Sequence, residues 1–223
     1  LQETGMNGSA LGPLPAGHPG ECVPSDPVQF VLVPAVYCLV LCVGLPGNLV
    51  ALLVFLQSGK VRKAIRIYLI NLTLADILFN LTLPLWIPYY LAGGDWLLSE
   101  AACRLAGAAY YLATYSAITF MVLISFNRYC APAAASPGSP RQQARAMVLG
   151  MLLVFVVCVA PYHLTLAPWV GSQPPVPLCG PPTALDVLHA LSVALLSLNS
   201  CLDPVVYCFS IQRFRADLGR TLR

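Results

Sequence analysis

The sequence predicts an all-α membrane protein, a transmembrane bundle of five helical spans. Of its 223 residues, 58% are hydrophobic and only 9% are charged, which is far too apolar for an ordinary water-soluble domain. A helix needs about 20 mostly apolar residues to cross the hydrocarbon core of a bilayer. Five stretches are long enough: roughly 28–57, 65–91, 101–130, 146–171 and 183–210. The alternative, a large buried helical core, fits these lengths poorly.

The segment before the first span, residues 1–27, is rich in glycine and proline, which predicts a mobile tail outside the membrane. Within it, residues 1–5 read "LQETG", precede Met6 and resemble a cloning scar, so we leave them out of the fold. Asn7 opens an Asn-Gly-Ser sequon on the predicted outer side. It is therefore a candidate glycosylation site.

Basic residues gather after the first span, after the third span and beyond the last: Lys60, Arg62, Lys63, Arg66, Arg128, Arg141, Arg145, Arg213, Arg215, Arg220 and Arg223. The positive-inside rule then places the N-terminus outside and the C-terminus inside. Residues 211–223 are expected to form a short cytoplasmic amphipathic helix. The net charge of +3 records this orientation and indicates no nucleic-acid partner. We expect a multi-pass protein of the plasma membrane in contact with lipid, with retention in the endoplasmic reticulum as the alternative fate.

Three of the nine cysteines, Cys22, Cys103 and Cys179, fall on the oxidising side of the predicted membrane. The number is odd, so at least one of them lacks an intrachain partner. Cys22 in the tail and Cys179 in the proline-rich loop before the last span are both on flexible segments. We favour a disulfide between them, which leaves Cys103 free or paired between chains.

Two acids lie inside the predicted spans, where a carboxylate costs several kcal/mol unless it is protonated, paired or hydrated. Asp76 and Asp203 should therefore face the bundle interior, where Asn199 and Ser200 also lie, and Asn199 shares a helix face with Asp203. Pro204 removes a backbone donor beside them. We predict a polar pocket for water or a small hard cation, with sodium as the candidate ion and no organic cofactor. A purely structural hydrogen-bond network is the alternative.

Five motifs follow one another along the spans: "GN" at 47–48, "LAD" at 74–76, a third span starting with Cys103 and ending in "NRY" at 127–129, "FVVCVAP" at 155–161, and "DPVVY" at 203–207 followed by "CFSIQRF". Each motif is weak alone. In this order, depth and orientation they resemble the rhodopsin-like (class A) G-protein-coupled receptors, over nearly all the chain after the tail. "LTLPLWIPYYLAGGDW" at 81–96 is similar to the branch that binds nucleotides and lipid mediators.

The resemblance implies roles for individual residues and a heterotrimeric G protein as the partner of a full-length form. Arg128 corresponds to the arginine that contacts the G protein, and Pro161 and Tyr207 to residues that take part in the helix movements of activation. The intramembrane acids and Asn199 correspond to a sodium-linked switch pocket. Asn127 replaces the commoner aspartate, and Val159 replaces an aromatic side chain often found before the proline.

The family has seven helices, and the resemblance implies that this chain lacks the fourth and fifth. Residues 130–145 pass directly from the end of a third-helix pattern to the start of a sixth-helix pattern. The outer loop whose cysteine would pair with Cys103 is absent as well. Removal of an even number of spans keeps the later helices in their normal directions. Splicing, a gene-model error and a deliberate deletion all remain open as the origin.

The leading functional hypothesis is a receptor for a lipid or anionic small-molecule mediator, with signalling impaired in this shortened form. The resemblance directs these outer residues toward a ligand: Trp86, Tyr89, Tyr110, Tyr111, Tyr162, His163 and His189. Aromatic packing or interfacial anchoring is the alternative for some of them. Tyr110 stands where amine receptors carry an acid, which disfavours a biogenic amine.

Other functions are open as well. One is a truncated, non-signalling isoform that modulates the full-length receptor as a homo- or hetero-oligomer. A small transporter or channel is disfavoured because the chain shows no internal repeat. An enzyme is disfavoured because no carboxylate or cysteine lies at ligand or triad spacing to the three histidines.

Overall fold

The computed structural model describes residues 26–57, 63–129, 140–172 and 181–210, with Phe214, Leu218 and Gly219. Its elements are η1 (Val28–Leu32), α1 (Val33–Gln57), α2 (Lys63–Leu91), α3 (Glu100–Tyr129), α4 (Pro140–Val154), η2 (Phe155–Val159), α5 (Ala160–Ser172) and α6 (Ala184–Ser210). Five stretches of the described chain are long and apolar enough to cross a membrane: Val28–Gln57, Ile65–Leu91, Glu100–Asn127, Met147–Ser172 and Ala184–Cys208. The predicted fold of five helical spans is confirmed.

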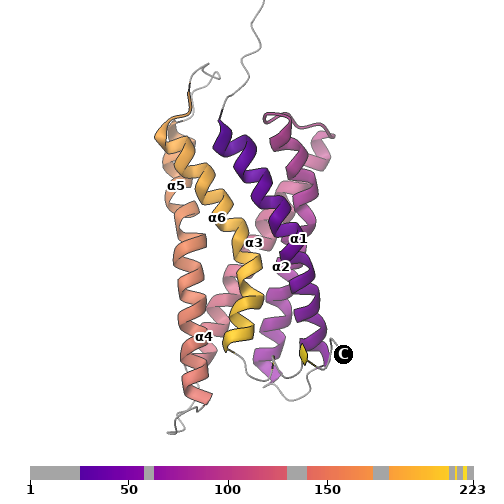
Figure 1. The fold of residues 1–223 in the computed structure, drawn as a ribbon, viewed down its shortest axis with the longest axis vertical. Helices are drawn as coiled ribbons and strands as arrows, with labels where there is room; N and C mark the ends of the chain where they lie inside the picture. Colours follow the sequence, from indigo (N-terminus) through magenta and orange to yellow (C-terminus); the bar gives the residue numbers. More distant parts are fainter. Residues whose placement is uncertain are drawn as a thin grey trace, which may run out of the picture.

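The helices form one upright bundle, in which η1 with α1 makes the first span, and α4, η2 and α5 together make the fourth (Figure 1). We call outer the end at which α1 and α6 begin, following the charge-based orientation. α1 packs against α2 and α6, α2 packs against α3, and α5 packs against α6. α3 packs against α4 but makes at most a marginal contact with α5. The bundle is therefore closed around α1, α2 and α6 and loosely joined between α3 and α5.

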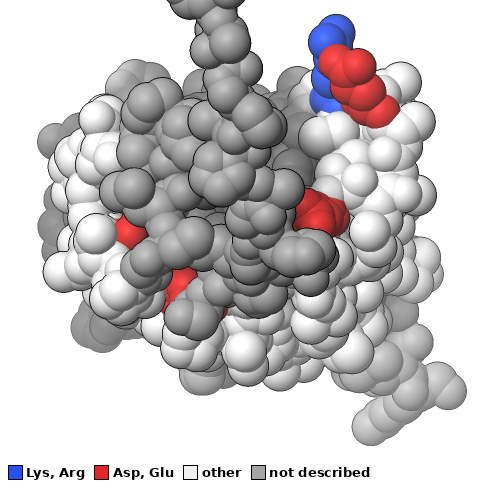
Figure 2. Space-filling model, turned by 90° about the horizontal axis from the view of Figure 1, so that it is seen from above, with Lys and Arg blue, Asp and Glu red and all other residues white. Residues whose placement is uncertain are grey.

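The outer end is the acidic end of the described chain. Figure 2 looks down on it and shows acidic side chains at separate places, with basic atoms only at the rim beside acidic ones. The rim pair is Glu100 and Arg104 on the first turns of α3, which form a salt bridge. An acid in the first turn also suits the positive end of the helix dipole.

The outward-facing surface of the bundle is largely apolar, as expected for helices that are surrounded by hydrocarbon. Leu81, Leu105, Leu149 and Leu164 are among the large side chains more than half exposed on separate helices. Hydrocarbon solvates such side chains as well as a protein core does, so the helices associate through close packing and polar contacts. Which faces turn inward is therefore decided by small and polar residues.

Gly44 shows how tightly the closed part is packed. A Cβ atom at this position on α1 would lie 3.0 Å from Cys201 Sγ on α6 and 3.2 Å from Asn80 Oδ1 on α2. Fewer than about one in ten real Cβ contacts are this short, so even a methyl group would require Cys201 and Asn80 to shift, and a larger side chain would require more. Glycine thus permits α1, α2 and α6 to meet beside the polar interior.

Two backbone features shape the remaining elements. α2 ends in a turn whose Gly93 and Gly94 have φ of 70° and 96°, values that side chains other than glycine rarely adopt. In the fourth span, the π-helical segment η2 directly precedes Pro161 in α5. A π-bulge and a proline both interrupt the regular hydrogen-bond ladder, so the helix is weakest there.

At the inner end, the structure describes only three residues of the predicted C-terminal helix, Phe214, Leu218 and Gly219. Phe214 is helical and buried, and its ring contacts Phe55 and Tyr207 at centroid distances of 5.2 and 6.1 Å. The helix over 211–223 stays a prediction, because most of those residues lie outside the described part. Residues 130–139, between α3 and α4, lie outside it too.

Candidate functional site

The two intramembrane acids meet in the middle of the bundle. Asp76 on α2 and Asp203 on α6 have 1% and 0% of their surface exposed. Their carboxyl groups are close enough to interact with each other. Each comes from a helix that packs against α1, so the closed side of the bundle buries them. Two acids from distant parts of the sequence therefore form one buried group.

Amide side chains bind the backbone around this pair. Asn48 on α1 donates to the carbonyl oxygens of Gly44, at 2.9 Å, and of Ser200 on α6, at 2.7 Å. Asn80 on α2 donates to the Asp76 carbonyl, at 2.8 Å, and to the Ser200 hydroxyl, at 3.2 Å. α1, α2 and α6 are thus joined by hydrogen bonds next to the acids. Such bonds fix the rotation of each helix in the bundle.

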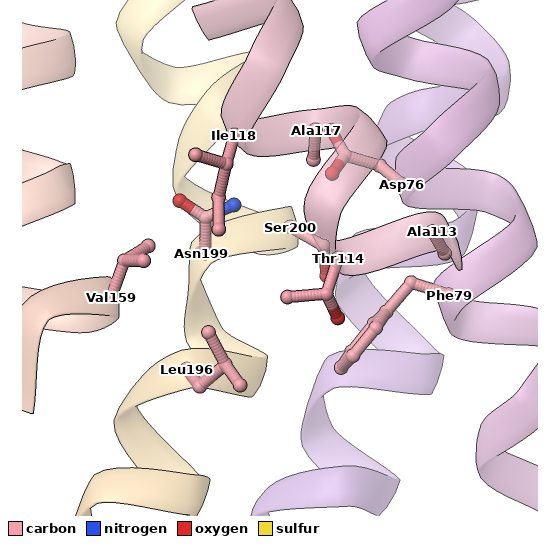
Figure 3. A pocket seen from close by; sticks show the side chains of 10 residues that line it. All are labelled: Asp76, Phe79, Ala113, Thr114, Ala117, Ile118, Val159, Leu196, Asn199 and Ser200. Atoms are coloured by element: carbon pink, nitrogen blue, oxygen red, sulfur yellow. The ribbon is translucent and has the colours of Figure 1, made fainter. Parts of the chain in front are cut away.

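Several oxygens of this interior have no hydrogen-bond partner among the described residues: Asp76 Oδ2, Asn199 Oδ1, Asp203 Oδ1, Asp203 Oδ2 and the Tyr207 hydroxyl. A cavity of about 10 Å³ lies beside Asp76 and Asn199, and Thr114 and Ser200 also border it (Figure 3). That volume is near the minimum for one water molecule. The arrangement therefore has room for a single small guest next to oxygens that lack partners in this part of the chain.

This chemistry restricts the guest. Two adjacent carboxylates in a low-dielectric interior cannot both remain charged cheaply, so one of them binds a proton or a cation lies between them. Hard cations prefer carboxylate, carbonyl and amide oxygens, which are the groups that Asp76, Asp203 and Asn199 present. The residues present thus fit a small hard cation such as sodium.

The predicted switch residues flank this polar interior. Tyr207 is fully buried, and its ring packs edge-on against Phe55 at a centroid distance of 5.3 Å. Pro161 follows η2, and Val159 of η2 borders the cavity. Arg128 lies at the end of α3, and its side chain is outside the described part. A movement of the fourth span at η2 would therefore reach the cavity wall directly.

An aromatic cluster occupies the outer part between α2 and α3. The Trp86 ring contacts Tyr89, Trp96 and Tyr110 at centroid distances of 5.7, 5.5 and 5.9 Å. Tyr110 is buried, and Tyr89 is half-buried. The Trp86 Nε1–H group is buried and has no hydrogen-bond partner in the described chain. A donor in this state is rare in a folded protein and marks a place where an acceptor is missing.

A second outer cluster joins α5 to α6. The Trp169 indole stacks on His189 with ring centroids 4.2 Å apart and planes 14° apart, and it donates to Asp186 Oδ1 at 3.0 Å. His189 Nδ1 lies 3.1 Å from the hydroxyl of Thr165, and its ring contacts Tyr162 at 5.6 Å. Asp186 also accepts from the Thr183 backbone and hydroxyl. The two helices are thus fastened by polar contacts at their outer ends.

Two of the predicted ligand residues lie between α3 and α5, on the loosely joined side of the bundle. We call this side the open side. Tyr111 on α3 is 45% exposed, and His163 on α5 is exposed as well. The hydroxyls of Tyr111 and Tyr162 are 3.4 Å apart, and His163 contacts Tyr115 at a centroid distance of 5.7 Å. These contacts bridge α3 and α5, whose backbones stay apart. The structure therefore brings Trp86, Tyr110, Tyr162 and His189 into the interior but leaves this pair at the surface.

The remaining predicted site residues are placed only in part. Cys22 and Cys179, the predicted disulfide, and Asn7, the predicted glycosylation site, lie outside the described residues. Within the described part, the Cys103 thiol is free and half-buried near the start of α3. These assignments stay predictions.

The sequence analysis missed several residues of the polar interior and of the two outer clusters. Asn80 lies four residues after Asp76, so helical spacing alone would have placed it on the same face. Trp169, Trp96 and Thr165 carried no such signal, because their partners come from other segments. Their roles follow only from the way in which the helices pack.

Comparison with known proteins agrees with this architecture. The chain matches the family described as 7 transmembrane receptor (rhodopsin family) over residues 47–146 and 133–207, which together span more than two thirds of it. It is 27% identical to the platelet-activating factor receptor of Mus musculus, with 91% of this chain and 89% of that protein aligned. It is 35% identical to that of Macaca mulatta over 67% of this chain and 73% of the relative. It is 25% identical to G-protein coupled receptor 183 of Salmo salar, with 86% of this chain and 80% of that protein aligned.

The alignments also show a gap. The comparison with the Mus musculus receptor runs over 307 positions, but 91% of this chain is only about 203 residues. About a hundred positions of the relative therefore have no counterpart here. The two segments of the family match meet at residues 133–146, in and after the connection from α3 to α4. The chain therefore belongs to the rhodopsin family of seven-transmembrane receptors, and its described part has five membrane-length helices.

Proposed function

We propose that this chain is a receptor for a lipid or anionic small-molecule mediator, and that its five-helix form does not activate a G protein by itself. Members of its family are multi-pass membrane receptors, not enzymes, and they act with small ligands and G proteins. The ligand class and the loss of signalling rest on separate observations.

The buried Trp86 Nε1–H group carries the proposal of the ligand class. It donates to nothing within the described chain and lies in an aromatic cluster at the outer end. A ligand with hydrogen-bond acceptors, such as a phosphate or a carboxylate, would satisfy it, whereas a cationic amine would not. Aromatic rings around the donor also suit an apolar body attached to a polar head.

Two residues of the outer half, Tyr110 and Asp186, support the same ligand class. Tyr110 occupies the α3 position at which an amine receptor would hold its cation, and it is buried against Trp86. Asp186 at the start of α6 already accepts from Trp169 and Thr183. A cationic ligand would therefore have to compete with existing contacts for this carboxylate.

Equilibrium binding in lipid nanodiscs tests the ligand class. We expect labelled platelet-activating factor, an acceptor-rich lipid, to bind more tightly than labelled dopamine. Trp86→Phe keeps the ring but removes the donor, so we expect it to weaken lipid binding about tenfold. The matched control is Trp96→Phe, whose indole already donates to the Ser99 carbonyl. Specific dopamine binding that survives Asp186→Asn would contradict the proposal.

We propose further that Asp76, Asn199, Ser200 and Asp203 hold a sodium ion. The oxygens without partners in the described chain and the adjacent cavity support this assignment. The ion would supply the positive charge that allows both acids to stay ionised. Because the acids come from α2 and α6, occupancy would favour the helix arrangement in which these two helices remain close.

The proposed loss of signalling rests on the inner half of the bundle. A groove of about 440 Å³ runs between α3 and the first part of the fourth span, lined by Met121, Val122, Ser125, Phe126, Val148, Met151, Leu152 and Phe155. In the family, the fifth helix forms much of the crevice that receives the G protein as the sixth helix moves away from the third. We expect this chain to leave that wall open and therefore to lack the surface on which a G protein docks.

Nucleotide exchange on a purified heterotrimeric G protein tests this point. We expect platelet-activating factor to cause no increase in exchange with this chain, whereas the Mus musculus receptor serves as the positive control. Robust agonist-stimulated exchange from the five-helix chain would contradict the proposal, because the missing segment would then be dispensable.

The second candidate function is a non-signalling form that modulates a full-length receptor. The open side between α3 and α5 favours it, since exposed polar groups there need a partner within the membrane. Co-expression of the chain with a full-length receptor should then lower the surface amount of the latter, with part of both retained in the endoplasmic reticulum. Unchanged surface delivery at the plasma membrane would argue against this function.

A further inference from the structure

Two exposed polar side chains, Tyr115 and His163, lie on the open side. Tyr115 on α3 is 48% exposed, and His163 on α5 is exposed too. Tyr115 lies at the midpoint of α3 (Glu100–Tyr129), roughly 20 Å of helix from either end. Their rings touch edge to face with centroids 5.7 Å apart, so their depths differ by no more than that distance. Both depths are within the hydrocarbon core.

The hydrogen-bonding capacity of the pair is half used. His163 Nδ1 lies 3.0 Å from the Val159 carbonyl oxygen, so this nitrogen carries the proton and Nε2 is the acceptor of the neutral ring. The described residues offer no partner to Nε2 or to the Tyr115 hydroxyl. The surface thus presents one donor and one acceptor side by side.

Acyl chains can satisfy neither group. Unpaired polar groups in hydrocarbon are costly, and transmembrane helices associate through hydrogen bonds that remove such groups from lipid. A suitable partner must place an acceptor opposite Tyr115 and a donor opposite His163 at one depth. A second copy of the same surface does so if it is turned by a two-fold axis along the membrane normal, because that rotation preserves depth.

We propose that the face formed by Tyr115 and His163 binds a second copy of this chain, with each Tyr115 hydroxyl donating to His163 Nε2 of the other copy. The two bonds are equivalent by symmetry. The inference goes beyond the proposed receptor function, since it depends on the open α3–α5 side and on no ligand.

Energy transfer between two labelled populations of the full chain tests the proposal. The chain carries a donor or an acceptor fluorophore at its C-terminus and is diluted stepwise with phosphatidylcholine in vesicles. We expect Tyr115→Phe and His163→Phe each to weaken self-association roughly five- to tenfold, as expected for the loss of two membrane hydrogen bonds. Tyr68→Phe on α2, which removes a hydroxyl elsewhere, should associate like the unaltered chain.

Mixing the two variants provides the decisive measurement. A Tyr115→Phe chain keeps His163, and a His163→Phe chain keeps Tyr115, so a mixed pair retains one of the two bonds while neither variant alone retains any. Transfer between the two variants should therefore exceed transfer within either one, at unchanged helix content by circular dichroism. A wild-type chain that stays monomeric at every dilution, variants that associate normally, or a mixture no stronger than its components would each overturn the proposal.

Discussion

The polar interior around Asp76 and Asp203 and the open side between α3 and α5 differ in how their polar groups are packed. Around Asp76 and Asp203, three helices approach so closely that a Cβ atom at Gly44 would crowd its neighbours, and amides join the helices by hydrogen bonds. On the open side, Tyr115 and His163 touch through their rings while the backbones of α3 and α5 stay apart. Both regions contain polar groups that lack partners within the described chain, but only the inner ones are shielded from lipid.

The difference follows from which helices are present. α1, α2, α3 and the helices of the last two spans supply all the walls of the inner core, so it survives the loss of two family helices. The family resemblance implies that two further helices would pack on the open side. A polar group without a partner in the described chain therefore supports the proposed cation in the first region and the proposed second copy in the second.

The largest effect is expected where the closed region is tightest. Gly44→Leu would force a side chain against Cys201 and Asn80, and overpacking of this kind costs about 1–3 kcal/mol or more. Gly107→Leu on α3 is the matched control, because a Cβ there meets nothing within 4 Å in the described chain. Thermal unfolding followed by circular dichroism measures both. Equal unfolding temperatures for the two variants would show that the helices do not meet as described.

The next prediction concerns the sodium ion that we propose beside Asp76. A bound cation stabilises the folded state by about 1.4 kcal/mol at ten times its dissociation constant. We therefore expect a higher unfolding temperature in sodium chloride than in choline chloride of equal ionic strength. Asp76→Asn should abolish the difference, whereas Asp186→Asn, which alters an outer acid, should retain it. A sodium response that persists in Asp76→Asn would rule out this site.

A smaller effect is expected at the outer contact between α5 and α6. Trp169→Phe removes the hydrogen bond to Asp186 but keeps a ring beside His189, so we expect a loss of about 1 kcal/mol. Asp186 retains its bonds to Thr183, which limits the damage. Chemical denaturation in detergent micelles measures the loss. No change would mean that the indole contributes through stacking alone.

The smallest effect is expected at the rim. Glu100 and Arg104 form a salt bridge one helical turn apart, and their side chains are 78% and 80% exposed. Water and salt screen such a pair, so Glu100→Gln should change the stability by less than about 0.5 kcal/mol. A change larger than that of Trp169→Phe would show that the outer end is more tightly organised than its exposure indicates.

Part of the candidate site could be predicted from the sequence. Asp76 and Asp203 are expected to face inward because a carboxylate in lipid is costly, and the structure buries both. The neighbour Asn80 follows from helical spacing. The exposure of Tyr111 and His163 could not be predicted, since a family pattern with seven helices directs both toward a ligand and says nothing of a bundle that lacks two of them.

The sequence by itself determined how many helices cross the membrane, where they start and end, and which polar residues they carry, because those properties depend on local composition and on the thickness of the bilayer. Only the tertiary structure decided which polar groups meet: Asp76 with Asn199, Trp169 with Asp186, and Tyr115 with His163 on the open side. The physical reason is that hydrophobicity drives insertion but not association within lipid. Helix rotation and tilt are therefore set by side-chain packing between segments far apart in the sequence.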